Sequence, residues 1–169
     1  LSGEIRNNLK FEEKTKDISK NVNVTKDPFV VYISGIDTYG SVSTVSRSDV
    51  NMILTVNPKT KQILMTSIPR DYYVTLANKG KKDKLTHSGL GGIENTVKIM
   101  ENFMGIDINY YGRVNFTSVI EIVDALGGIN IDSTVAFTGY DGTSFKKGTN
   151  HITGKQALEF SRERHAFGG

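Results

Sequence analysis

The chain contains no cysteine, and this absence excludes disulfide bonds and thiolate metal sites. It also has no run of about 18 apolar residues, the length that a membrane-spanning helix needs, and no charged and then apolar leader of the kind that forms a signal peptide. There is no internal repeat and no low-complexity tract. The 169 residues fit one domain, which is long enough to bury roughly two-thirds of the surface of its unfolded chain.

Charge is only slightly unbalanced, with a net charge of +3 and a pI near 9.0. This balance permits anionic partners. Nucleic-acid binders concentrate lysine and arginine on one helix or interleave them with aromatic residues, and the basic residues here do neither. The densest lysine patches, within residues 79–84 and at residues 146–147, are typical of solvated loops. We therefore expect no nucleic-acid partner.

Four of the six arginines lie in three short segments: Ser46–Asp49 (SRSD), Pro69–Asp71 (PRD) and Ser161–Arg164 (SRER). Arginine presents a planar fork of donors that binds phosphate oxygens at two points, whereas the scattered lysines are typical of ordinary surface. The arginines are therefore the first candidates for binding an anionic ligand.

Residues 1–26 carry charges of both signs, and Ile5 and Leu9 are spaced for one face of a helix. This pattern predicts an N-terminal helical arm or linker outside the core. Asp27-Pro28 marks the boundary, because a residue before proline is pushed out of the helical region. The main domain is accordingly expected over residues 27–169.

The expected sheet begins with the continuous apolar run at residues 29–36, a central strand with both faces covered. Residues 50–56 and 62–68 are the next two strands, joined by a turn signal at residues 57–60. If they form an antiparallel hairpin, the start of the first and the end of the second lie at the same end of the sheet, where ligands of α/β proteins bind. The residues expected to meet at this end are Asp37, Arg47, Asp49, Arg70 and Asp71.

Carboxylates and arginines around one cleft predict a site for a divalent cation and a pyrophosphate, because Mg²⁺ prefers one or two carboxylates together with substrate phosphates. The alternative is that each arginine–aspartate pair is only a surface ion pair. The histidines lack the spacing of a zinc site, and His87 either contacts substrate or is structural. Likewise, the SGLGG segment at residues 88–92 is either a phosphate-binding turn or a flexible helix entry.

The second half of the sequence alternates helices and strands. Helices are expected at residues 93–104 and 116–126, and strands at residues 108–114 and 128–132. Residues 133–150 look irregular, with Phe137, Tyr140 and Phe145 exposed. A short helix then runs from Thr153 to Glu159, and residues 161–164 are expected to be extended, so that Arg162 and Arg164 face one side. The pattern predicts an α/β fold, with a central mixed β-sheet in a three-layer α/β/α domain.

Several motifs in order make the chain resemble the LytR-CpsA-Psr family of bacterial cell-envelope proteins. The motifs span most of the chain: GID (35–37), SRSD (46–49), IPRDYYV (68–74), DKLTHSG (83–89), YYGRVNF with the following VDALGGI, and TGKQALEFSRER. The resemblance implies a phosphotransferase that takes a glycopolymer (capsule or wall teichoic acid) from a polyprenyl-pyrophosphate carrier and ligates it to peptidoglycan. It also implies an extracellular position on a Gram-positive cell, held by an N-terminal membrane anchor that this sequence lacks.

Residue by residue, the resemblance implies that Asp37 and Asp49 bind Mg²⁺, or alternatively Mn²⁺. It implies that the pyrophosphate is bound by Arg47, Arg70, Arg162 and Arg164. Lys84 and Asp71 match recurrent family positions, Lys84 as a substrate contact and Asp71 as a candidate general base. The family domain is expected to continue beyond Gly169 into a further arginine- and glutamine-bearing motif and a closing helix, on this chain or on a separate C-terminal fragment.

Two other functions compete with the transferase hypothesis. The same arginines and metal would serve a pyrophosphatase, in which water replaces the peptidoglycan hydroxyl. A non-catalytic module for anionic polymers or lipids would need the basic residues but no turnover.

Overall fold

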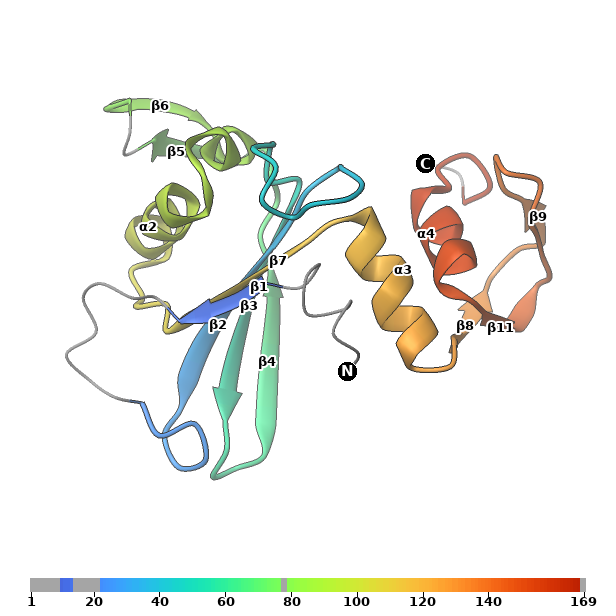
Figure 1. Cartoon of the computed structure of the whole chain (residues 1–169), viewed down its shortest axis with the longest axis horizontal. Helices are drawn as coiled ribbons and strands as arrows, with labels where there is room; N and C mark the ends of the chain where they lie inside the picture. The colour runs from blue at the N-terminus through green and yellow to red at the C-terminus, as the bar shows by residue number, and fades with distance from the viewer. Residues whose placement is uncertain (1–9, 14–21, 77–78, 168–169) are drawn as a thin grey trace. The chain divides into compact units, whose positions relative to one another are not determined.

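The computed structural model describes residues 10–13, 22–76 and 79–167. These residues divide into two compact units, one within residues 7–115 and the other within residues 116–169 (Figure 1). The first unit contains a mixed sheet with helices, and the second contains two helices and two small antiparallel strand pairs. None of the described helices is both long enough and apolar enough to span a membrane.

The central sheet has five strands in the order β1-β7-β2-β3-β4. Their bounds are Lys10–Glu13 (β1), Phe29–Gly35 (β2), Val50–Asn57 (β3), Gln62–Ser67 (β4) and Tyr110–Val114 (β7). Strand β2 pairs in parallel with β7 and antiparallel with β3, which itself pairs antiparallel with β4. The α/β class, the mixed sheet, the central place of β2 and the β3–β4 hairpin are therefore confirmed.

At residues 10–13 the structure has a strand, β1, where the sequence predicted a helical arm or linker. Residues 10–13 pair antiparallel with β7, Lys10 opposite Arg113 and Glu13 opposite Tyr110. Backbone groups along the outer edge of β7 need hydrogen-bond partners, and a strand supplies them where a helix does not. The helical pattern at Ile5 and Leu9 lies outside the described residues.

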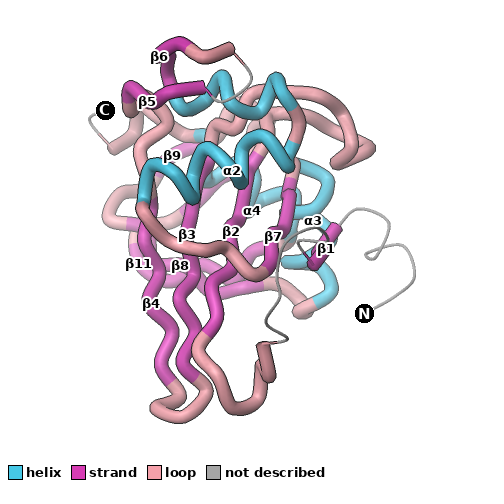
Figure 2. The backbone as a smooth tube through the Cα atoms, turned by 90° about the vertical axis from the view of Figure 1, so that its left-hand side faces the viewer, coloured by secondary structure: helices cyan, strands magenta, loops and turns pink. Residues whose placement is uncertain are grey.

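The core of this unit lies between the sheet and helix α2 (Ile93–Met104). Side chains alternate along a strand, so Tyr32 shares one face of the sheet with its cross-strand neighbours Ile53 and Tyr111. All three are buried against α2, whose Ile99 and Met100 are also buried. Figure 2 shows α2 lying across β3, β2 and β7. The helix ends, as expected, at Gly105, which adopts the left-handed conformation that favours glycine.

A second hairpin carries Lys84 toward the end of the sheet. Strand β5 (Tyr73–Leu76) pairs antiparallel with β6 (Lys81–Lys84), and a 3-10 helix, η1 (Leu85–Gly91), follows at once. Leu76 and Leu85 are fully buried in the core shared with α2. This burial ties the hairpin and η1 to the sheet.

The second unit begins with helix α3 (Phe116–Ala125), which packs against helix α4 (Gly154–Arg162). Four strands lie between the two helices in sequence: β8 (Ile129–Ser133), β9 (Phe137–Thr138), β10 (Ser144–Phe145) and β11 (Gly148–Ile152). Strand β8 pairs with β11, and β9 pairs with β10. The expectation of an irregular segment at residues 133–150 is therefore wrong.

The reason is a cluster of four phenylalanines that orders this segment. Phe137 stacks on Phe145 with ring centroids 4.7 Å apart, and both rings contact Phe160 of α4. Phe167 packs on Phe137 and Phe160. Phe145 is therefore buried rather than exposed, whereas Tyr140 is exposed as predicted.

Candidate functional site

The strand register brings three segments of the first unit to the same end of the sheet. Gly35, the last residue of β2, pairs with Val50, the first residue of β3, and the Asp49 amide donates to the Gly35 carbonyl at 2.9 Å. Strand β4 ends at Ser67, so the chain reaches Arg70 at this end as well. Asp37 follows β2 by two residues. The predicted common position of these backbone segments is confirmed.

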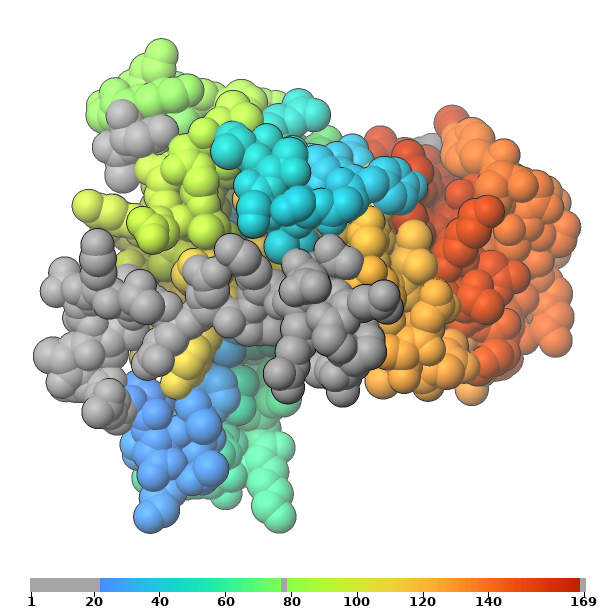
Figure 3. Space-filling view, in the orientation of Figure 1, coloured from blue at the N-terminus to red at the C-terminus, as the bar shows by residue number. Residues whose placement is uncertain are grey.

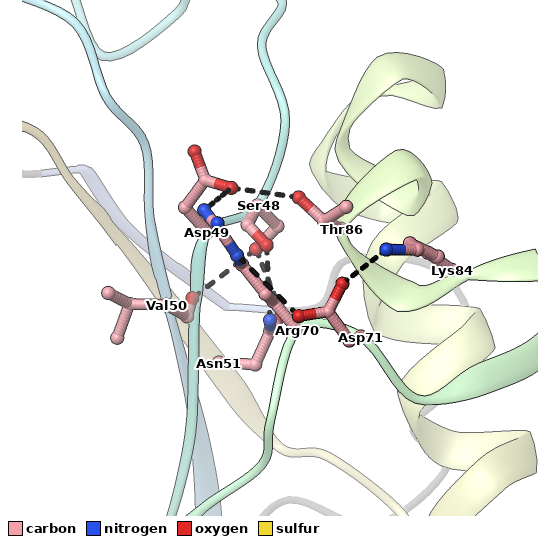
Figure 4. A network of polar contacts seen from close by, with 8 residues as sticks. All are labelled: Ser48, Asp49, Val50, Asn51, Arg70, Asp71, Lys84 and Thr86. Atoms are coloured by element: carbon pink, nitrogen blue, oxygen red, sulfur yellow. Dashed lines mark hydrogen bonds and ion pairs between the residues drawn. The ribbon is translucent and has the colours of Figure 1, made fainter. Parts of the chain in front are cut away.

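Asp49 is the centre of the site. Its Oδ1 atom lies 2.8 Å from Nη1 of Arg70 and accepts a hydrogen bond of 2.9 Å from the Thr86 hydroxyl (Figure 4). The Asp49 side chain is 16% exposed, whereas that of Arg70 is 48% exposed. The carboxylate is thus held by two donors, Arg70 and Thr86. The Arg70 guanidinium itself still faces solvent and has further N–H donors for an anion.

Asp71 and Lys84 form a second pair next to the first. The Lys84 ammonium lies 2.7 Å from Oδ1 of Asp71, and Nε of Arg70 lies 4.0 Å from Oδ2 of the same residue. The Lys84 hydrogen bond, then the Lys84 charge and more weakly the Arg70 charge, hold the pKa of Asp71 below its ordinary value. A carboxylate with a lowered pKa is a weaker proton acceptor, so this geometry makes Asp71 first of all a partner of Lys84.

A buried polar network fixes the strand residues behind Asp49. The Tyr32 hydroxyl donates to Oδ1 of Asn51 at 2.6 Å, and the Ser48 hydroxyl lies 2.8 Å from that of Ser34 and donates to Asn51 at 2.9 Å. Burial raises the pKa of Tyr32 to about 12, so its hydroxyl stays protonated as a donor. The network holds the β3 entry rigid, because buried polar groups that lose a partner are costly.

Gly89 lets η1 approach the SRSD segment. The Ser48 amide donates to the Thr86 carbonyl at 3.0 Å, and a Cβ on Gly89 would lie 2.4 Å from the Ser46 carbonyl oxygen and 2.7 Å from the Ser48 nitrogen. Only glycine fits at this contact. For Gly89 in the SGLGG segment, the structure favours a packing role over a phosphate-binding turn, and His87 is likewise occupied, with Nδ1 2.9 Å from Oδ1 of Asp83.

Arg113 is a residue that our sequence reasoning missed. It lies on β7, is only 6% exposed, and donates to the carbonyls of Val42 at 3.2 Å and Ser46 at 3.4 Å. Asn115 donates to the Gly40 carbonyl of the same loop at 2.9 Å. The two residues hold the loop that leads to the exposed Arg47. The sequence did contain a signal of this role, because Arg113 is a charged residue inside the otherwise uncharged strand YYGRV.

Arg162 and Arg164 belong to the second unit. The extended segment expected at residues 161–164 is wrong for Ser161 and Arg162, which are helical, whereas Glu163 is extended. A capping box of Thr153 and Gln156 starts α4, which runs on to Arg162. The Arg162 guanidinium lies 5.0 Å from the centre of the Phe116 ring, a cation–π contact that favours the helical position. Arg164 follows the Glu163 cap and is exposed.

Two carboxylates at this end of the sheet, Asp37 and Asp49, are of the type that binds a hard divalent cation. In the described part of the chain no cluster of three or more histidine, aspartate or glutamate side chains is arranged for a metal. Asp37 is exposed at the end of β2, and both contacts described for the Asp49 carboxylate use Oδ1. One or two carboxylate oxygens are what Mg²⁺ takes from proteins when phosphates supply the rest.

The sequence model of the LytR_cpsA_psr family matches residues 2–169. The chain belongs to the LytR-CpsA-Psr family. The resemblance found in its motifs is therefore confirmed, and the Asp49–Arg70 site lies within this family's domain.

Named members of the family are close in sequence and structure. The chain is 44% identical over 154 residues to the polyisoprenyl-teichoic acid–peptidoglycan teichoic acid transferase TagU of Bacillus subtilis, covering 90% of this chain and 49% of that protein. The crystal structure of B. subtilis TagV matches with a TM-score of 0.73 and 35% identity, over 83% of this chain and 57% of that one. The family member TagT with bound octaprenyl pyrophosphate lipid matches with a TM-score of 0.71 and 33% identity, over 90% and 63%. The chain thus spans about half the length of the curated relatives that it matches.

Proposed function

We propose that this chain is the core of a phosphotransferase that moves a glycopolymer from a polyprenyl-pyrophosphate carrier to peptidoglycan. The observation that carries the proposal is the Asp49–Arg70–Thr86 contact at the sheet end, in a chain 44% identical to a teichoic acid transferase. A TagT structure with bound octaprenyl pyrophosphate lipid, another similar protein, supports a carrier of that chemistry. Wall teichoic acid is the better supported polymer and capsule the alternative, since a TagT structure is also bound to a wall teichoic acid lipid.

The reaction requires an acceptor hydroxyl oxygen to attack the sugar-bearing phosphorus. A new phosphorus–oxygen bond forms, the bond to the bridging oxygen breaks, polyprenyl phosphate leaves, and the hydroxyl proton passes to a base or to water. Arg70 and Arg47 would hold the pyrophosphate oxygens, since positioning and charge neutralisation dominate phosphoryl transfer. Arg162 and Arg164 are proposed to bind the same group.

Lys84 is proposed as a further substrate contact, and Asp71 as the residue that orients it. The 2.7 Å ion pair between them keeps the ammonium near Arg70, whose Nε atom lies 4.0 Å from the same carboxylate. The alternative is that Asp71 acts as the general base. Its lowered pKa would then give a smaller driving force for proton transfer from the acceptor hydroxyl.

A magnesium ion is proposed at Asp37 and Asp49, with manganese as a substitute. The ion would neutralise charge on the pyrophosphate. The two carboxylates of this chain would place it beside Arg70, which is already 2.8 Å from Asp49. Because Arg70 shares Oδ1 of Asp49 with Thr86, the protein supplies the orientation of the carboxylate before any ligand arrives.

The cellular setting follows from the proposed substrates. Lipid-linked polymer and peptidoglycan meet at the outer face of the cytoplasmic membrane of Gram-positive cells, so we place the site there, held by an N-terminal membrane anchor. The relatives are about twice as long as the matched region, and we propose that residues beyond Gly169, on the same chain or on an associated fragment, add to the pyrophosphate site.

A product assay tests the proposal. The protein, with the segments that precede and follow it in its own gene, is incubated with a polyprenyl-pyrophosphate-linked saccharide and Mg²⁺, with and without peptidoglycan fragments. Polymer joined to peptidoglycan supports the transferase. Free phosphosaccharide formed at the same rate in both reactions would instead identify a pyrophosphatase. Binding without any turnover would identify a non-catalytic module.

A further inference from the structure

A pocket of about 350 Å³ lies in the first unit, between the loop after β2 and the start of α2. It is distinct from the Asp49 contacts, since none of the residues that hold Asp49 lines it. Figure 3 shows the loop, in blue to cyan, against the yellow-green segment that includes α2. The lining residues are Val42, Ser43, Val45, Gly91, Gly92, Ile93, Glu94, Tyr111 and Arg113.

Arg113 is the charged group in the wall of this pocket that lies deepest in the protein, with 6% of its surface exposed. Among the described residues no carboxylate forms an ion pair with it, and its Nε atom is buried without a hydrogen-bond partner. Burial, opposed only by the Tyr32 hydroxyl, lowers the pKa of the guanidinium. A buried charge with no counterion is costly, and an anion in the pocket would remove that cost.

The start of α2 adds positive potential to the same pocket. This helix has 12 residues, and its N-cap is Gly92, which supplies no side chain to bond the first-turn amides. Gly92 has a φ of 85°, so a residue with a side chain is disfavoured at this position. Uncapped amides at a helix start attract anions. Glu94, which is exposed at the rim, is the only carboxylate among the described lining residues and opposes this field.

We propose that this pocket binds a single oxyanion, a phosphate or a carboxylate carried on a small organic group. The Arg113 guanidinium and the first amides of α2 hold the anion, and Val42, Val45, Ile93 and Tyr111 contact the group that carries it. The site is separate from the pyrophosphate site proposed above, and only the identity of its natural ligand rests on the proposed function. The bound anion has two natural sources: a phosphate of the polymer chain and a carboxylate of the acceptor.

Anion binding would also act on the Arg47 segment. The same guanidinium holds the carbonyls of Val42 and Ser46, so an anion that engages Arg113 stiffens the loop that leads to Arg47. Occupancy of the pocket therefore couples to the position of Arg47 in the other site.

The direct test follows the Arg113 side-chain Nε–H signal by NMR while an anion is added. The probes are inorganic phosphate, glycerol 3-phosphate and N-acetylmuramic acid, with uncharged N-acetylglucosamine as the matched control. The Arg113 signal should shift in a saturable way with at least one anion and not with the control. A larger effect of glycerol 3-phosphate identifies the polymer as the source, and a larger effect of N-acetylmuramic acid identifies the acceptor.

Three variants distinguish an anion-binding role of Arg113 from a purely structural one. Arg113→Met should weaken binding by about tenfold or more, as expected when a charge-assisted hydrogen bond is lost. Because Arg113→Met removes loop contacts, Val45→Asp provides a second route: Val45 is exposed at the pocket, so the variant should fold and should also weaken binding. Glu94→Gln should strengthen it.

An Arg113 signal that none of the anions moves would overturn the proposal, as would equal affinities in all three variants. Failure of the proposed transferase is a separate result. Asp49→Ala should lower transfer by about 100-fold or more and leave the Arg113 titration unchanged, so either conclusion can stand without the other.

Discussion

The carboxylate of Asp49 and the guanidinium of Arg70 lie 2.8 Å apart although 21 positions separate them in the sequence. The antiparallel pairing of β3 with β4 brings them together, because the first strand begins and the second ends at the same end of the sheet. Thr86 reaches the same carboxylate oxygen from η1. The candidate site is therefore built on the rigid part of the fold.

Asp49→Ala should lower Mg²⁺-dependent turnover by about 100-fold or more, a loss typical of removing one electrostatic group from a transition state. The protein should stay folded, because the residue lies at a strand start rather than in the apolar core. Turnover is measured against Mg²⁺ concentration, with circular dichroism as the check on folding. Asp27→Asn, at the other end of β2, is the control and should be silent. Full activity of a folded Asp37→Ala/Asp49→Ala protein would contradict the proposal that these two residues bind the metal ion.

Arg70→Ala should weaken binding of a polyprenyl pyrophosphate by about tenfold or more, because it removes charge-assisted hydrogen bonds to phosphate. Arg70→Lys should recover only part of the loss, since lysine keeps the charge and loses the planar fork. Arg47→Ala should behave like Arg70→Ala. Lys59→Ala, in the turn at the far end of the β3–β4 hairpin, is the matched loss of one positive charge. If melting temperature falls while affinity is unchanged, the arginines serve stability instead.

Lys84→Met should raise the pKa of Asp71 toward its ordinary value, since Lys84 is the main cause of the lowered pKa. A carboxyl with a lowered pKa in the folded state adds stability above its unfolded pKa, and this is lost as the pH falls through the folded pKa. The free energy of unfolding of the variant should therefore change less with pH in the acid range than that of the wild type. NMR titration of the Asp71 carboxyl measures the shift directly, and Lys82→Met on the same strand should leave it unmoved.

Gly89→Ala should destabilise the protein by roughly 1–3 kcal/mol, the usual cost of overpacking. The new Cβ would lie 2.4 Å from the Ser46 carbonyl, a backbone atom that cannot move aside without shifting the SRSD segment. Thermal unfolding measures the loss, and pyrophosphate affinity should fall with it. Leu90→Ala, at an exposed neighbouring position, is the control. An unchanged melting temperature would show that η1 and the SRSD segment do not pack as closely as described.

Tyr32→Phe should cost about 1–2 kcal/mol of folding stability, because the Asn51 oxygen loses a buried donor. Activity should fall more than stability if the network positions Asp49, which is one residue from Ser48 in the chain. Chemical denaturation and turnover of the same preparation compare the two effects. Tyr73→Phe, at an exposed tyrosine, should change neither.

Much of the first unit could be predicted from local patterns. The apolar run at residues 29–36 and the turn signal at residues 57–60 indicated a central strand and a hairpin, and the hairpin alone was enough to place Asp49 and Arg70 at one sheet end. The helical spacing of apolar residues over residues 93–104 and the glycine that follows them predicted α2. These features depend on neighbours in the sequence, which is why the residues themselves report them.

Other features were decided by contacts between distant segments. Residues 10–13 form a strand because the edge of β7 offers backbone partners, and residues 133–150 are ordered because Phe160 packs on Phe137 and Phe145. Arg162 stays helical beside Phe116. The role of Arg113 is of the same kind: its sequence shows a charge in an apolar strand, and only the tertiary structure shows that the charge is buried, lacks a carboxylate partner among the described residues and lines a pocket. Burial and partners are properties of the packed chain, and a local pattern does not contain them.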